Sequence, residues 1–350
     1  MSKYFITGGA GFIGSNFIQM CINKNHKVLN FDLLTYSGNL DNLHITSKNT
    51  NYSFIKGDIC DKDLLDKSLK EFRPNYIINF AAESHVDKSI DNPDNFINTN
   101  IVGTYKILSS SADYYKNLTE DQRRIFKFLH ISTDEVYGSL DQKGLFDENS
   151  KYNPSSPYSA SKAASDHLVN SWNKTYDLPT IITNCSNNYG PYQFPEKLIP
   201  HMIQRCLSED YLPIYGDGKN IRDWIHVYDH CDAIYELTKK GIVGSRYNIG
   251  GSEEKSNIEI VKEICHLLDE LRPSSNLKSY KELIRFVEDR PGHDFRYAID
   301  SSKIQNEIGW KPKLKFKEGL AKTINWYLKN QDWLDNIKNN KYKLTRIGLR

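Results

Sequence analysis

A glycine-rich run near the N-terminus is the feature that most restricts the fold of this chain. Gly8, Gly11 and Gly14 follow a β-branched and aromatic run, Tyr4–Thr7, and open a segment with helical character. The spacing is G-x-x-G-x-x-G, which allows a tight turn from a strand into a helix and lets a ligand approach the backbone. The N–H groups at the start of such a helix favour the charge of a pyrophosphate. The run predicts a dinucleotide-binding unit, and a glycine turn without a ligand is the alternative.

Strand-like runs recur between amphipathic stretches along the first half of the chain. The predicted strands are Tyr4–Thr7, Val28–Phe31, Tyr52–Lys56, Tyr76–Phe80, Ile125–Ser132 and Thr180–Cys185. The predicted helices are Gly11–Asn23, Asp61–Phe72, Pro93–Tyr115 and Pro157–Tyr176. Strands that alternate with helices form a parallel sheet covered on both faces. We therefore predict an α/β fold, a Rossmann-type doubly wound parallel sheet with a smaller mixed α/β substrate-binding lobe.

The alternation of strand and helix weakens after Cys185. Residues 187–222 are rich in Pro, Gly and Tyr, and 289–293 are a second irregular stretch, so both are predicted to be loops over a ligand rather than sheet. With 350 residues the chain is long enough for two lobes. We predict a dinucleotide-binding domain over 1–186, to which 223–252 returns, a substrate lobe over 187–222 and 253–335, and a frayed Lys- and Asn-rich tail over 336–350.

Composition restricts the partners of the chain. The 46 basic and 44 acidic residues leave a formal charge of +2, without the basic excess that favours nucleic acid or an anionic membrane. There is no apolar run of the ~20 residues that cross a bilayer, and the N-terminus lacks the pattern of a signal peptide, so we expect a cytoplasmic protein. We expect reduced thiols and no metal site, because the cysteines are scattered without a C-x-x-C pair. They are Cys21, Cys60, Cys185, Cys206, Cys231 and Cys265.

An acidic residue ends the second predicted strand. Asp32 lies 18 residues after Gly14, where a carboxylate accepts hydrogen bonds from both adenosine ribose hydroxyls and repels a 2′-phosphate. We therefore expect NAD rather than NADP, although a turn-forming acid is the alternative. Residues 57–59 and 80–82 follow the third and fourth strands, where such sheets bind ligands, but each alone is typical of a turn.

Two groups of side chains suggest chemistry. Tyr158 and Lys162 are four residues apart in a predicted helix, so the phenol and the ammonium share one face and the cation favours the phenolate, a general base. Thr133, Asp134 and Glu135 follow the fifth strand. Elimination of water needs one group to take a carbon-bound proton and another to protonate the departing hydroxyl, whereas a simple dehydrogenase has no use for two acids there. A chance pair on a helix surface and a solvated acidic loop or helix cap are the alternatives.

These motifs together resemble the extended short-chain dehydrogenase/reductase family, from Gly8 to about Leu328. The supporting stretches are Thr35–Leu40, Ala81–Asp87, Ser132–Gly138, Tyr158–Lys162, Tyr189–Pro191, Pro195–Leu198, Arg222–Trp224 and Asp289–Asp294. The adjacent Asp and Glu resemble the nucleoside-diphosphate-glucose 4,6-dehydratases of that family, since its 4-epimerases lack the pair and its GDP-mannose dehydratases typically carry Ser-Glu. The chain departs from this pattern at Lys88, where Arg is usual, and at Ile225-His226, where Leu-Tyr is usual.

The resemblance implies an NAD-dependent dehydration of dTDP-glucose with no net redox change. Tyr158, supported by Thr133 and Lys162, would take the C4 hydroxyl proton as hydride leaves C4. Glu135 would then take the C5 proton while Asp134 protonates the C6 hydroxyl, and the hydride would return to C6. The product would be a 4-keto-6-deoxy sugar nucleotide, a precursor for deoxysugars of the dTDP-rhamnose type. The resemblance also implies a homodimer through the two helices predicted at 93–115 and 157–176.

The resemblance also assigns binding residues. For the cofactor they are Gly8, Gly11, Phe12, Ile13, Gly14, Asp32, Leu33, Leu34, Thr35, Asp58, Ile59, Phe80, Ala81, Ala82, Ser84, Thr99, Tyr158, Lys162 and Asn188. For the sugar nucleotide they are Ser84, His85, Thr133, Asn187, Glu196, Lys197, Leu198, Pro213, Tyr215, Arg222, Asn257, Arg290 and His293. Arg222 and Arg290 can each offer a planar fork to phosphate oxygens, although a lone Arg is more often a solvated surface residue.

Two other functions remain open. A UDP-glucose dehydratase or a 4-epimerase belongs to the same chemistry, and the choice of base depends on contacts to one methyl group, worth only ~1 kcal/mol. A NAD-sensing binding protein would need the glycines and Asp32. Such a protein would not need the set Thr133, Asp134, Glu135, Tyr158 and Lys162, which is intact here.

Overall fold

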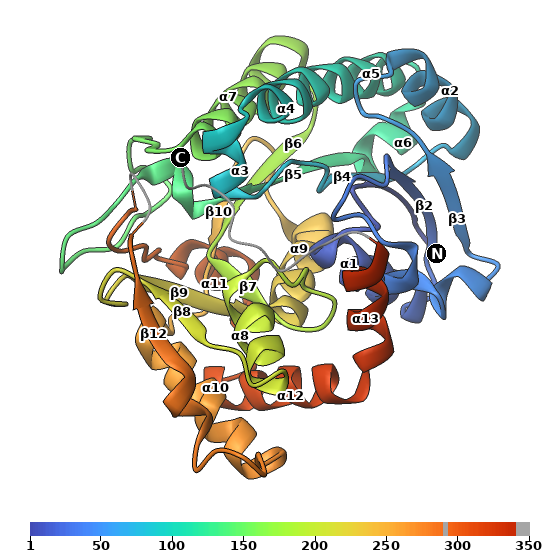
Figure 1. Ribbon diagram of the computed structural model, residues 1–350. Helices are drawn as coiled ribbons and strands as arrows, with labels where there is room; N and C mark the ends of the chain where they lie inside the picture. Colours follow the sequence, from blue (N-terminus) through green and yellow to red (C-terminus); the bar gives the residue numbers. More distant parts are fainter. Residues whose placement is uncertain (290–292, 341–350) are drawn as a thin grey trace.

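A seven-stranded parallel sheet is the centre of the protein, seen in a computed structural model that describes residues 1–289 and 293–340 (Figure 1). The strand order is β10-β6-β5-β4-β1-β2-β3. The strands are β1 (Lys3–Thr7), β2 (Lys27–Asp32), β3 (Tyr52–Lys56), β4 (Tyr76–Asn79), β5 (Lys127–Thr133), β6 (Thr180–Cys185) and β10 (Arg246–Ile249). The order reverses between β1 and β4, so their carboxyl ends flank the crevice where such sheets bind ligands. The predicted doubly wound fold is confirmed.

Helices cover both faces of this sheet (Figure 1). One layer contains α2 (Lys62–Phe72), α5 (Thr104–Lys116) and α7 (Pro157–Tyr176), and its apolar residues form one buried cluster with the sheet. The other layer contains α1 (Phe12–Asn23), α9 (Val227–Lys240) and α11 (Ser302–Ile308), which enclose a second cluster. Both faces are buried, which is why the predicted strands are nearly continuous apolar runs.

A second lobe lies beside the carboxyl ends of the large sheet (Figure 1). Its helices are α8 (Leu198–Leu207), α10 (Asn257–Leu271), α12 (Phe316–Lys329) and α13 (Gln331–Asn340). Its strands are β7 (Asn187–Tyr189), β8 (Leu212–Tyr215), β9 (Ile221–His226), β11 (Glu254–Ser256) and β12 (Ile284–Val287). They form two small sheets, β11-β9-β7 and β12-β8, and the lobe has an apolar core of its own.

The six predicted strands and four predicted helices are confirmed, with two differences. The helix predicted over 93–115 is interrupted, since α4 (Asp94–Phe96) leads into a π-helix over Ile97–Gly103 before α5 begins. The fifth strand was predicted to begin at Ile125, but that residue ends α6 (Glu120–Ile125). A capping box between Thr119 and Gln122 starts this short helix and delays the strand by two residues.

The prediction that 187–222 are loops rather than sheet is wrong. This stretch contains β7, α8, β8 and the start of β9, and each strand pairs with a segment distant in sequence, such as β8 with β12. Strands this short have no periodicity of their own, because the pairing partner stabilises them. Of the second irregular stretch, Asp289 and His293 are irregular as predicted, whereas Arg290, Pro291 and Gly292 lie outside the described residues.

The prediction of a frayed tail from residue 336 is wrong for its first part. Helix α13 continues to Asn340, and Trp333, Leu334 and Ile337 are packed into the core of the second lobe, with Ile337 only 1% exposed. Their spacing places the three side chains on one helical face. The indole Nε1 of Trp333 also donates to Asn42 Oδ1 at 2.8 Å, which ties α13 to the first lobe. Residues 341–350 lie outside the described part.

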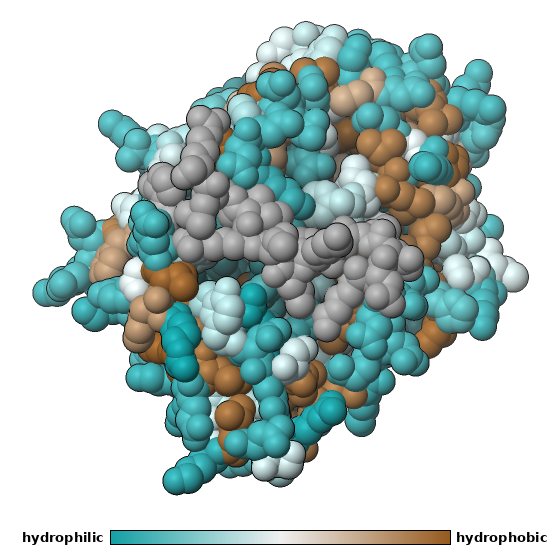
Figure 2. Space-filling view, viewed as in Figure 1, coloured by the Kyte–Doolittle hydropathy of each residue, from teal (hydrophilic) through white to brown (hydrophobic). Residues whose placement is uncertain are grey.

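The face of the molecule in view in Figure 2 is mostly hydrophilic, with hydrophobic side chains in smaller groups. Over the residues that the structure describes, none of the helices combines the length and the apolar character needed to cross a bilayer. All six cysteines are free thiols, and five of them are buried, all but Cys60.

Candidate active site

Two connected cavities lie at the carboxyl ends of the large sheet. The first, of about 300 Å³, is lined by the glycine turn, the ends of β2, β4 and β5, and the start of α7. The second, of about 520 Å³, lies against the second lobe. Four residues line both, namely Glu135, Asn187, Glu196 and Lys197. Volumes of this size suit small-molecule ligands, and the shared wall allows one ligand in each cavity to meet the other.

The glycine turn has room for a ligand at one position only. Gly8 has a φ of +67°, and a Cβ there would lie 2.6 Å from the nitrogen of Ala81. A Cβ on Gly14 would lie 2.4 Å from the carbonyl oxygen of Gly8, so both glycines are required by the chain itself. A Cβ on Gly11 would meet only that same oxygen, at 3.3 Å, and Gly11 lines the cavity as the N-cap of α1. Its missing side chain leaves space for a pyrophosphate at the helix N-terminus.

Asp32 is held rigidly at the edge of the first cavity. Its Oδ2 accepts a hydrogen bond from the nitrogen of Ala10 at 2.9 Å, and its Oδ1 accepts one from the nitrogen of Leu34 at 2.7 Å. Leu34 adopts a φ of +59° to make this contact. Each carboxylate oxygen has a further lone pair, so the group can also accept from ribose hydroxyls and would repel a phosphate. Leu34 binds Asp32 rather than lining the cavity.

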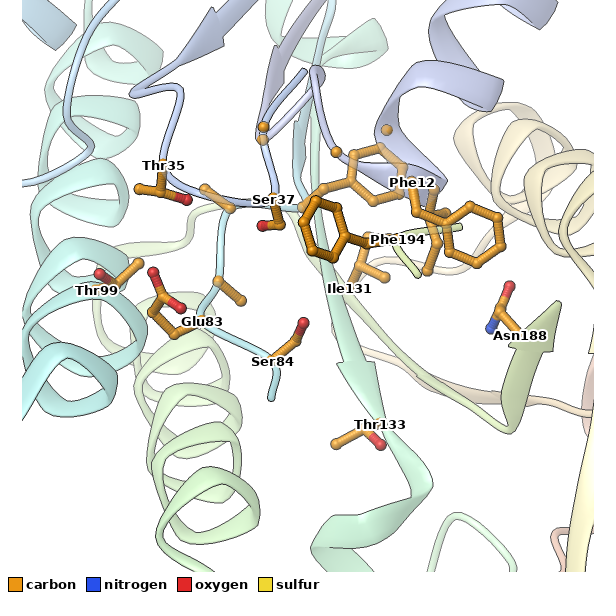
Figure 3. A pocket seen from close by; sticks show the side chains of 18 of the residues that line it. Phe12, Thr35, Ser37, Glu83, Ser84, Thr99, Ile131, Thr133, Asn188 and Phe194 are labelled. Atoms are coloured by element: carbon orange, nitrogen blue, oxygen red, sulfur yellow. The ribbon is translucent and has the colours of Figure 1, made fainter. Parts of the chain in front are cut away.

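The first cavity brings together the other cofactor residues that the resemblance assigns. They are Gly8, Gly11, Phe12, Ile13, Gly14, Asp32, Leu33, Thr35, Asp58, Ile59, Phe80, Ala81, Ala82, Ser84, Thr99, Tyr158, Lys162 and Asn188. In Figure 3, Phe12 and Phe194 gather on one side of this cavity, opposite Glu83 and Thr99. The sequence reasoning missed Phe194 and Glu83. Glu83 falls inside a motif that carried the resemblance, and Phe194 falls between two of them.

Tyr158 and Lys162 project from the first turns of α7, whose N-terminus has a capping box between Ser156 and Ser159. Both side chains are buried, and the Lys162 ammonium donates to the carbonyl oxygen of Ile131 at 2.8 Å. Burial and the Glu135 carboxylate raise the pKa of Tyr158 well above its usual value, while a hydrogen bond with Thr133 lowers it. Burial thus opposes the phenolate that the Tyr158–Lys162 pair was expected to favour together with the positive ring of the cofactor.

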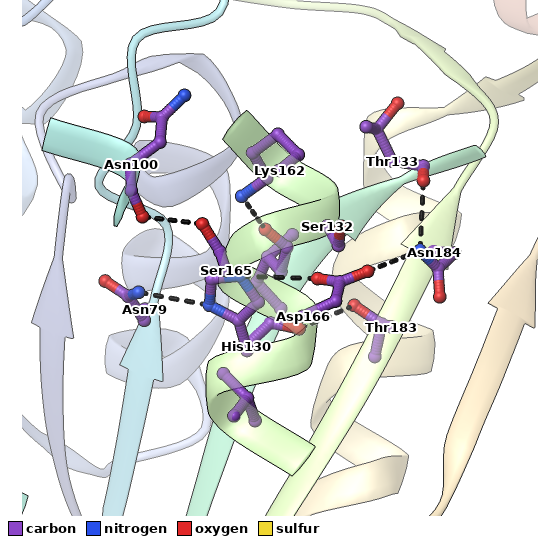
Figure 4. A network of polar contacts seen from close by, with 12 residues as sticks. Asn79, Asn100, His130, Ser132, Thr133, Lys162, Ser165, Asp166, Thr183 and Asn184 are labelled. Atoms are coloured by element: carbon purple, nitrogen blue, oxygen red, sulfur yellow. Dashed lines mark hydrogen bonds and ion pairs between the residues drawn. The ribbon is translucent and has the colours of Figure 1, made fainter. Parts of the chain in front are cut away.

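A buried polar network supports Lys162 from behind (Figure 4). Asp166 lies one helical turn further along α7 and accepts hydrogen bonds from the Tyr152 hydroxyl at 2.6 Å and from Asn184 Nδ2 at 3.2 Å. His130 Nε2 lies 3.5 Å from the other Asp166 oxygen. Burial lowers the pKa of Lys162, and the Asp166 carboxylate opposes that shift. The sequence reasoning missed Asp166, although it stands four residues after Lys162.

The network continues across the sheet. Asn79 Nδ2 contacts His130 Nδ1 at 3.1 Å, and the Thr7 hydroxyl donates to Asn79 Oδ1 at 2.6 Å. These three residues are neighbours in register on β1, β4 and β5. Burial lowers the pKa of His130 well below its usual value, so its ring is neutral. Because Nδ1 accepts from Asn79, the ring proton is on Nε2 and faces Asp166.

Thr133 ends β5 and caps the short turn that carries the two acids. Its Oγ1 accepts from the Glu135 nitrogen and donates to Asp134 Oδ1, each at 3.3 Å. Asp134 is 2% exposed, and within the described part of the chain its Oδ2 has no hydrogen-bond partner. Burial, and then the charges of Glu135 and Asp223, raise the pKa of Asp134 well above its usual value. The pair thus consists of a buried carboxyl whose raised pKa favours its protonated form and a more exposed neighbour, Glu135, that lines both cavities.

The second cavity brings together most of the substrate residues that the resemblance assigns. They are His85, Asn187, Glu196, Lys197, Leu198, Pro213, Tyr215, Arg222, Asn257 and His293. Ser84 and Thr133 line the first cavity instead, and Arg290 lies outside the described residues. Arg222 is not the solvated residue of the alternative interpretation, since its guanidinium stacks on Tyr297 at 4.3 Å and donates to the carbonyl oxygen of Asp294 at 2.9 Å.

Glu196 forms a polar clasp at the junction of the two cavities. The Tyr36 hydroxyl donates to Glu196 Oε1 at 3.0 Å, and Lys88 Nζ lies 3.3 Å from Oε2. The same ammonium lies 3.0 Å from the centre of the Tyr36 ring. His85 Nε2 lies 3.6 Å from Oε2. The clasp, defined by these four residues, joins the loop after β2 and the segment after β4 to the second lobe.

The chain matches the family described as GDP-mannose 4,6 dehydratase over residues 5–323. A dTDP-glucose 4,6-dehydratase of Xanthomonas campestris pv. campestris is 52% identical over 99% of both chains, and one of Neisseria meningitidis serogroup B is 53% identical over 99% of both. Among solved structures, the dTDP-glucose 4,6-dehydratase of Bacillus anthracis in complex with NAD is 45% identical, with a TM-score of 0.85 over 97% of this chain and 100% of that one. A UDP-glucose 4-epimerase of Thermotoga maritima is 27% identical, with a TM-score of 0.83 over 94% of this chain and 99% of that one.

Proposed function

The chain belongs to the GDP-mannose 4,6-dehydratase family, and from this premise we propose that it is an NAD-dependent dTDP-glucose 4,6-dehydratase. As a hydro-lyase it converts dTDP-glucose to dTDP-4-keto-6-deoxyglucose and water, a precursor of deoxysugars such as rhamnose. The observation that carries the proposal is the environment of Asp134 and Glu135. A buried carboxyl that retains its proton and a neighbouring carboxylate in the same cavity as Tyr158 are what elimination of water requires.

The residues of the first cavity fit NAD. The space at Gly11 and the N-terminus of α1 suit the pyrophosphate, and the Asp32 carboxylate suits the adenosine ribose. NAD supplies a reversible hydride acceptor and, when oxidised, a positive ring charge near Tyr158. Asn188 would face the nicotinamide end, and its amide is already oriented, because Oδ1 accepts from His230 Nδ1 at 2.8 Å.

Oxidation at C4 requires a base, and we assign this role to Tyr158. A base must be ionised when it takes the proton, whereas burial by itself raises the pKa of this phenol. Within the chain, Thr133 lowers this pKa, and a cationic Lys162, whose charge Asp166 favours, would act in the same direction. Positive charge around Tyr158 is thus a condition for the first step.

Elimination then needs an acid and a base on the C5–C6 side of the sugar. Glu135 takes the C5 proton, which the adjacent C4 ketone has made acidic, and Asp134 protonates the departing C6 hydroxyl. The high pKa of Asp134 suits a proton donor at neutral pH. Glu135 afterwards returns its proton to C5 as hydride reaches C6. The two acids therefore act only after C4 has been oxidised.

We propose that the nucleotide part of the substrate occupies the second cavity. Arg222 offers charge to the diphosphate, and Asn257 and His293 lie on the same lining. We also propose a NAD-binding domain over 1–186 with 223–252 and a sugar-nucleotide lobe over 187–222 and 253–335, with two elements that cross these bounds: α11 packs on the large sheet, and β9 belongs to a small sheet. In support of it, 223–252 contain α9 and β10, which complete the first lobe.

We further propose a cytoplasmic homodimer that pairs through α5 and α7. These helices pack side by side in Figure 1, and the layer that they form with the π-helix exposes large apolar side chains, namely Ile97, Val102, Tyr105 and Tyr176. Exposed apolar groups on neighbouring helices are typical of a subunit interface. The free cysteine thiols agree with a reducing compartment. Sedimentation of the protein against a Tyr105→Glu variant tests the interface.

A product assay tests the activity directly. The purified protein is incubated separately with dTDP-glucose and UDP-glucose, and each reaction is analysed by mass spectrometry for a sugar nucleotide that has lost one water. We expect the dehydrated product with dTDP-glucose, formed faster than with UDP-glucose. Preferential dehydration of UDP-glucose would reassign the substrate, and a galactose epimer without loss of water would reassign the reaction.

A further inference from the structure

At the end of each cycle, the proposed reaction leaves Tyr158 with an additional proton and Asp134 without its proton. The hydride that leaves C4 returns at C6, and the proton that Glu135 takes from C5 returns to C5. Tyr158, however, keeps the proton of the C4 hydroxyl, because the product is a ketone. Asp134 has lost its proton to the departing water. One proton must therefore move from Tyr158 to Asp134 before the next substrate can react.

We propose that the Thr133 hydroxyl carries this proton directly from Tyr158 to Asp134, an inference that rests on the proposed function. The Thr133 hydroxyl donates to Asp134 Oδ1 at 3.3 Å, and Thr133, Asp134 and Tyr158 line the same cavity. Thr133 also lowers the pKa of the Tyr158 phenol, as a hydroxyl close to it does. The direction of the printed bond fits, since the Thr133 hydroxyl donates to Asp134, and a hydroxyl oxygen has two lone pairs, so it can also accept a proton from the phenol.

The transfer is balanced at every atom. The Tyr158 O–H bond breaks as its proton moves to Thr133 Oγ1, and the Thr133 proton moves to Asp134 Oδ1. Thr133 ends as the same hydroxyl, Tyr158 as phenolate and Asp134 as carboxylic acid. A half-turn about the Asp134 Cβ–Cγ bond exchanges the two oxygens before the next cycle, and Oδ2 leaves no hydrogen bond to a described residue by turning. No oxidant, reductant or further reactant is needed.

Burial favours an internal route while the cavity is occupied. Asp134 is 2% exposed and Tyr158 is 8% exposed, and a bound sugar would cover what remains of both. Lys162 is the other buried group that could take the phenol proton. Its ammonium donates to the carbonyl oxygen of Ile131 in strand β5, and the negative charge of Asp166 raises its pKa. Thr133, in contrast, is hydrogen-bonded to Asp134, the group that must receive the proton.

Comparison of the first turnover with later ones tests the relay on the NAD-loaded protein. With enzyme in excess over dTDP-glucose, product formation uses only the proton that Asp134 already holds. With substrate in excess, each later turnover needs Asp134 to be reprotonated. Thr133→Val removes the hydroxyl but keeps the branched shape, and we expect its later turnovers to be slower than its first by roughly 10²-fold. Thr133→Ser keeps the hydroxyl, so its first and later turnovers should have equal rate constants.

Infrared spectroscopy provides a second readout on the carboxyl group itself. The C=O stretch of protonated Asp134 is identified by its loss in Asp134→Asn. After one turnover the band should return at once in the wild type and in Thr133→Ser, but in Thr133→Val only when acetic acid is added as a small proton donor. Equal first and later rate constants in Thr133→Val, or an equally fast return of the band, would overturn the relay. Absence of product in the first turnover of the wild type would instead count against the proposed function.

Discussion

His130 Nε2 lies 3.5 Å from Asp166 Oδ1, and both side chains are fully buried, His130 on strand β5 and Asp166 on the helix that carries Lys162. The Tyr152 hydroxyl and the Asn184 amide donate to Asp166, which lies one helical turn from Lys162, and the neutral His130 ring packs beside it. A buried charge needs a partner, and the two groups favour each other's charged forms: Asp166 opposes the lowering of the Lys162 pKa by burial, and Lys162 opposes the raising of the Asp166 pKa. We infer that Asp166 positions charge rather than touching any ligand.

Asp166→Asn should move the pH profile of C4 oxidation. Lys162 already has a lowered pKa from burial, and loss of the carboxylate lowers it further. The alkaline decline in rate, which follows deprotonation of Lys162, should therefore begin at a lower pH. Rapid-mixing absorbance of the reduced nicotinamide measures it, with Tyr152→Phe as a milder change at the same carboxyl. His130, Arg246 and Cys185 also carry titratable groups near this pair and stay unchanged.

Asp113→Asn is the matched control for the pH profile. This carboxylate is on α5 in the same lobe, its side chain is 58% exposed, and it pairs with Lys62 at the surface. Its removal should leave the profile where it was. An alkaline limb that does not move in Asp166→Asn would remove the positioning role.

Tyr158→Phe should slow the first half-reaction. The phenyl ring keeps the packing of the buried phenol and loses only the base, so hydride transfer from C4 should fall by roughly 10²-fold or more. A single turnover followed by nicotinamide absorbance measures this rate. Near-normal reduction of the cofactor would contradict the assignment of the base.

The double variant Asp134→Asn with Glu135→Gln should stop the reaction halfway. Size and hydrogen bonding are preserved, yet neither an acid for the C6 hydroxyl nor a base for C5 remains. Reduced nicotinamide should accumulate with an oxidised, still hydrated sugar, while dehydration falls by several powers of ten, each lost group being worth ~10² to 10⁴. The single variants should not multiply to that total, because groups that act together are non-additive. If cofactor reduction vanishes as well in a folded variant that binds substrate, the acids serve the oxidation.

Asp32 should set the choice of dinucleotide. Calorimetry on stripped protein should show that NAD binds more tightly than NADP, since the carboxylate accepts from ribose hydroxyls and repels a 2′-phosphate. Asp32→Ala should reduce the ratio of the NAD affinity to the NADP affinity, because NAD should bind more weakly and NADP more tightly. Equal affinities in the unchanged protein would show that Asp32 only caps its strand.

Acid should destabilise the protein through its buried histidines. Burial lowers the pKa of His230 to about 3 and that of His226 to about 4, below the unfolded value of about 6.5. The unfolded chain then binds more protons, so the stability is complete above about pH 6.5 and falls as the pH drops towards the folded pKa values. Each histidine contributes a slope of about 1.4 kcal/mol per pH unit in that window.

Urea unfolding at a series of pH values measures this slope. His230→Gln can keep the hydrogen bond to Asn188 without titrating. The decrease in unfolding free energy per pH unit between about pH 6 and 4 should therefore be smaller, by about the 1.4 kcal/mol that one histidine contributes. An exposed histidine, His44, is the matched control, because His44→Gln should leave the slope unchanged. Identical slopes in all three proteins would contradict the assignment of His230.

The first lobe could be predicted because its signals are local. The glycine turn, Asp32 at the end of β2 and the Tyr158–Lys162 pair each follow from residues close together in sequence. The strands of the second lobe pair with segments distant in sequence. Strand β8, for example, could not be predicted from its own residues, because it is stabilised by pairing with β12. Helix α13 was missed because its Lys- and Asn-rich composition conceals three apolar residues on one face.

The candidate site shows the same division. Asp134 and Glu135 could be selected as an acid and base pair, but their different environments could not, because burial and Asp223 set the pKa of Asp134 only in the folded chain. Asp166 and the Glu196 clasp were missed for a related reason. A side chain that supports another across the sheet, or that joins two lobes, has no signature in the residues beside it.

The clasp around Glu196 affects how readily a bound dinucleotide can exchange with the dinucleotides in the cell. Because Tyr36, Lys88 and His85 all contact one carboxylate at the junction of the cavities, we expect a dinucleotide in the first cavity to exchange slowly, since several contacts must break together. Such a cofactor is acquired once and reused, and each turnover returns it to its starting state. We therefore expect the enzyme to keep working when a cell shifts between respiration and fermentation, since its output is insulated from the ratio of oxidised to reduced dinucleotide outside.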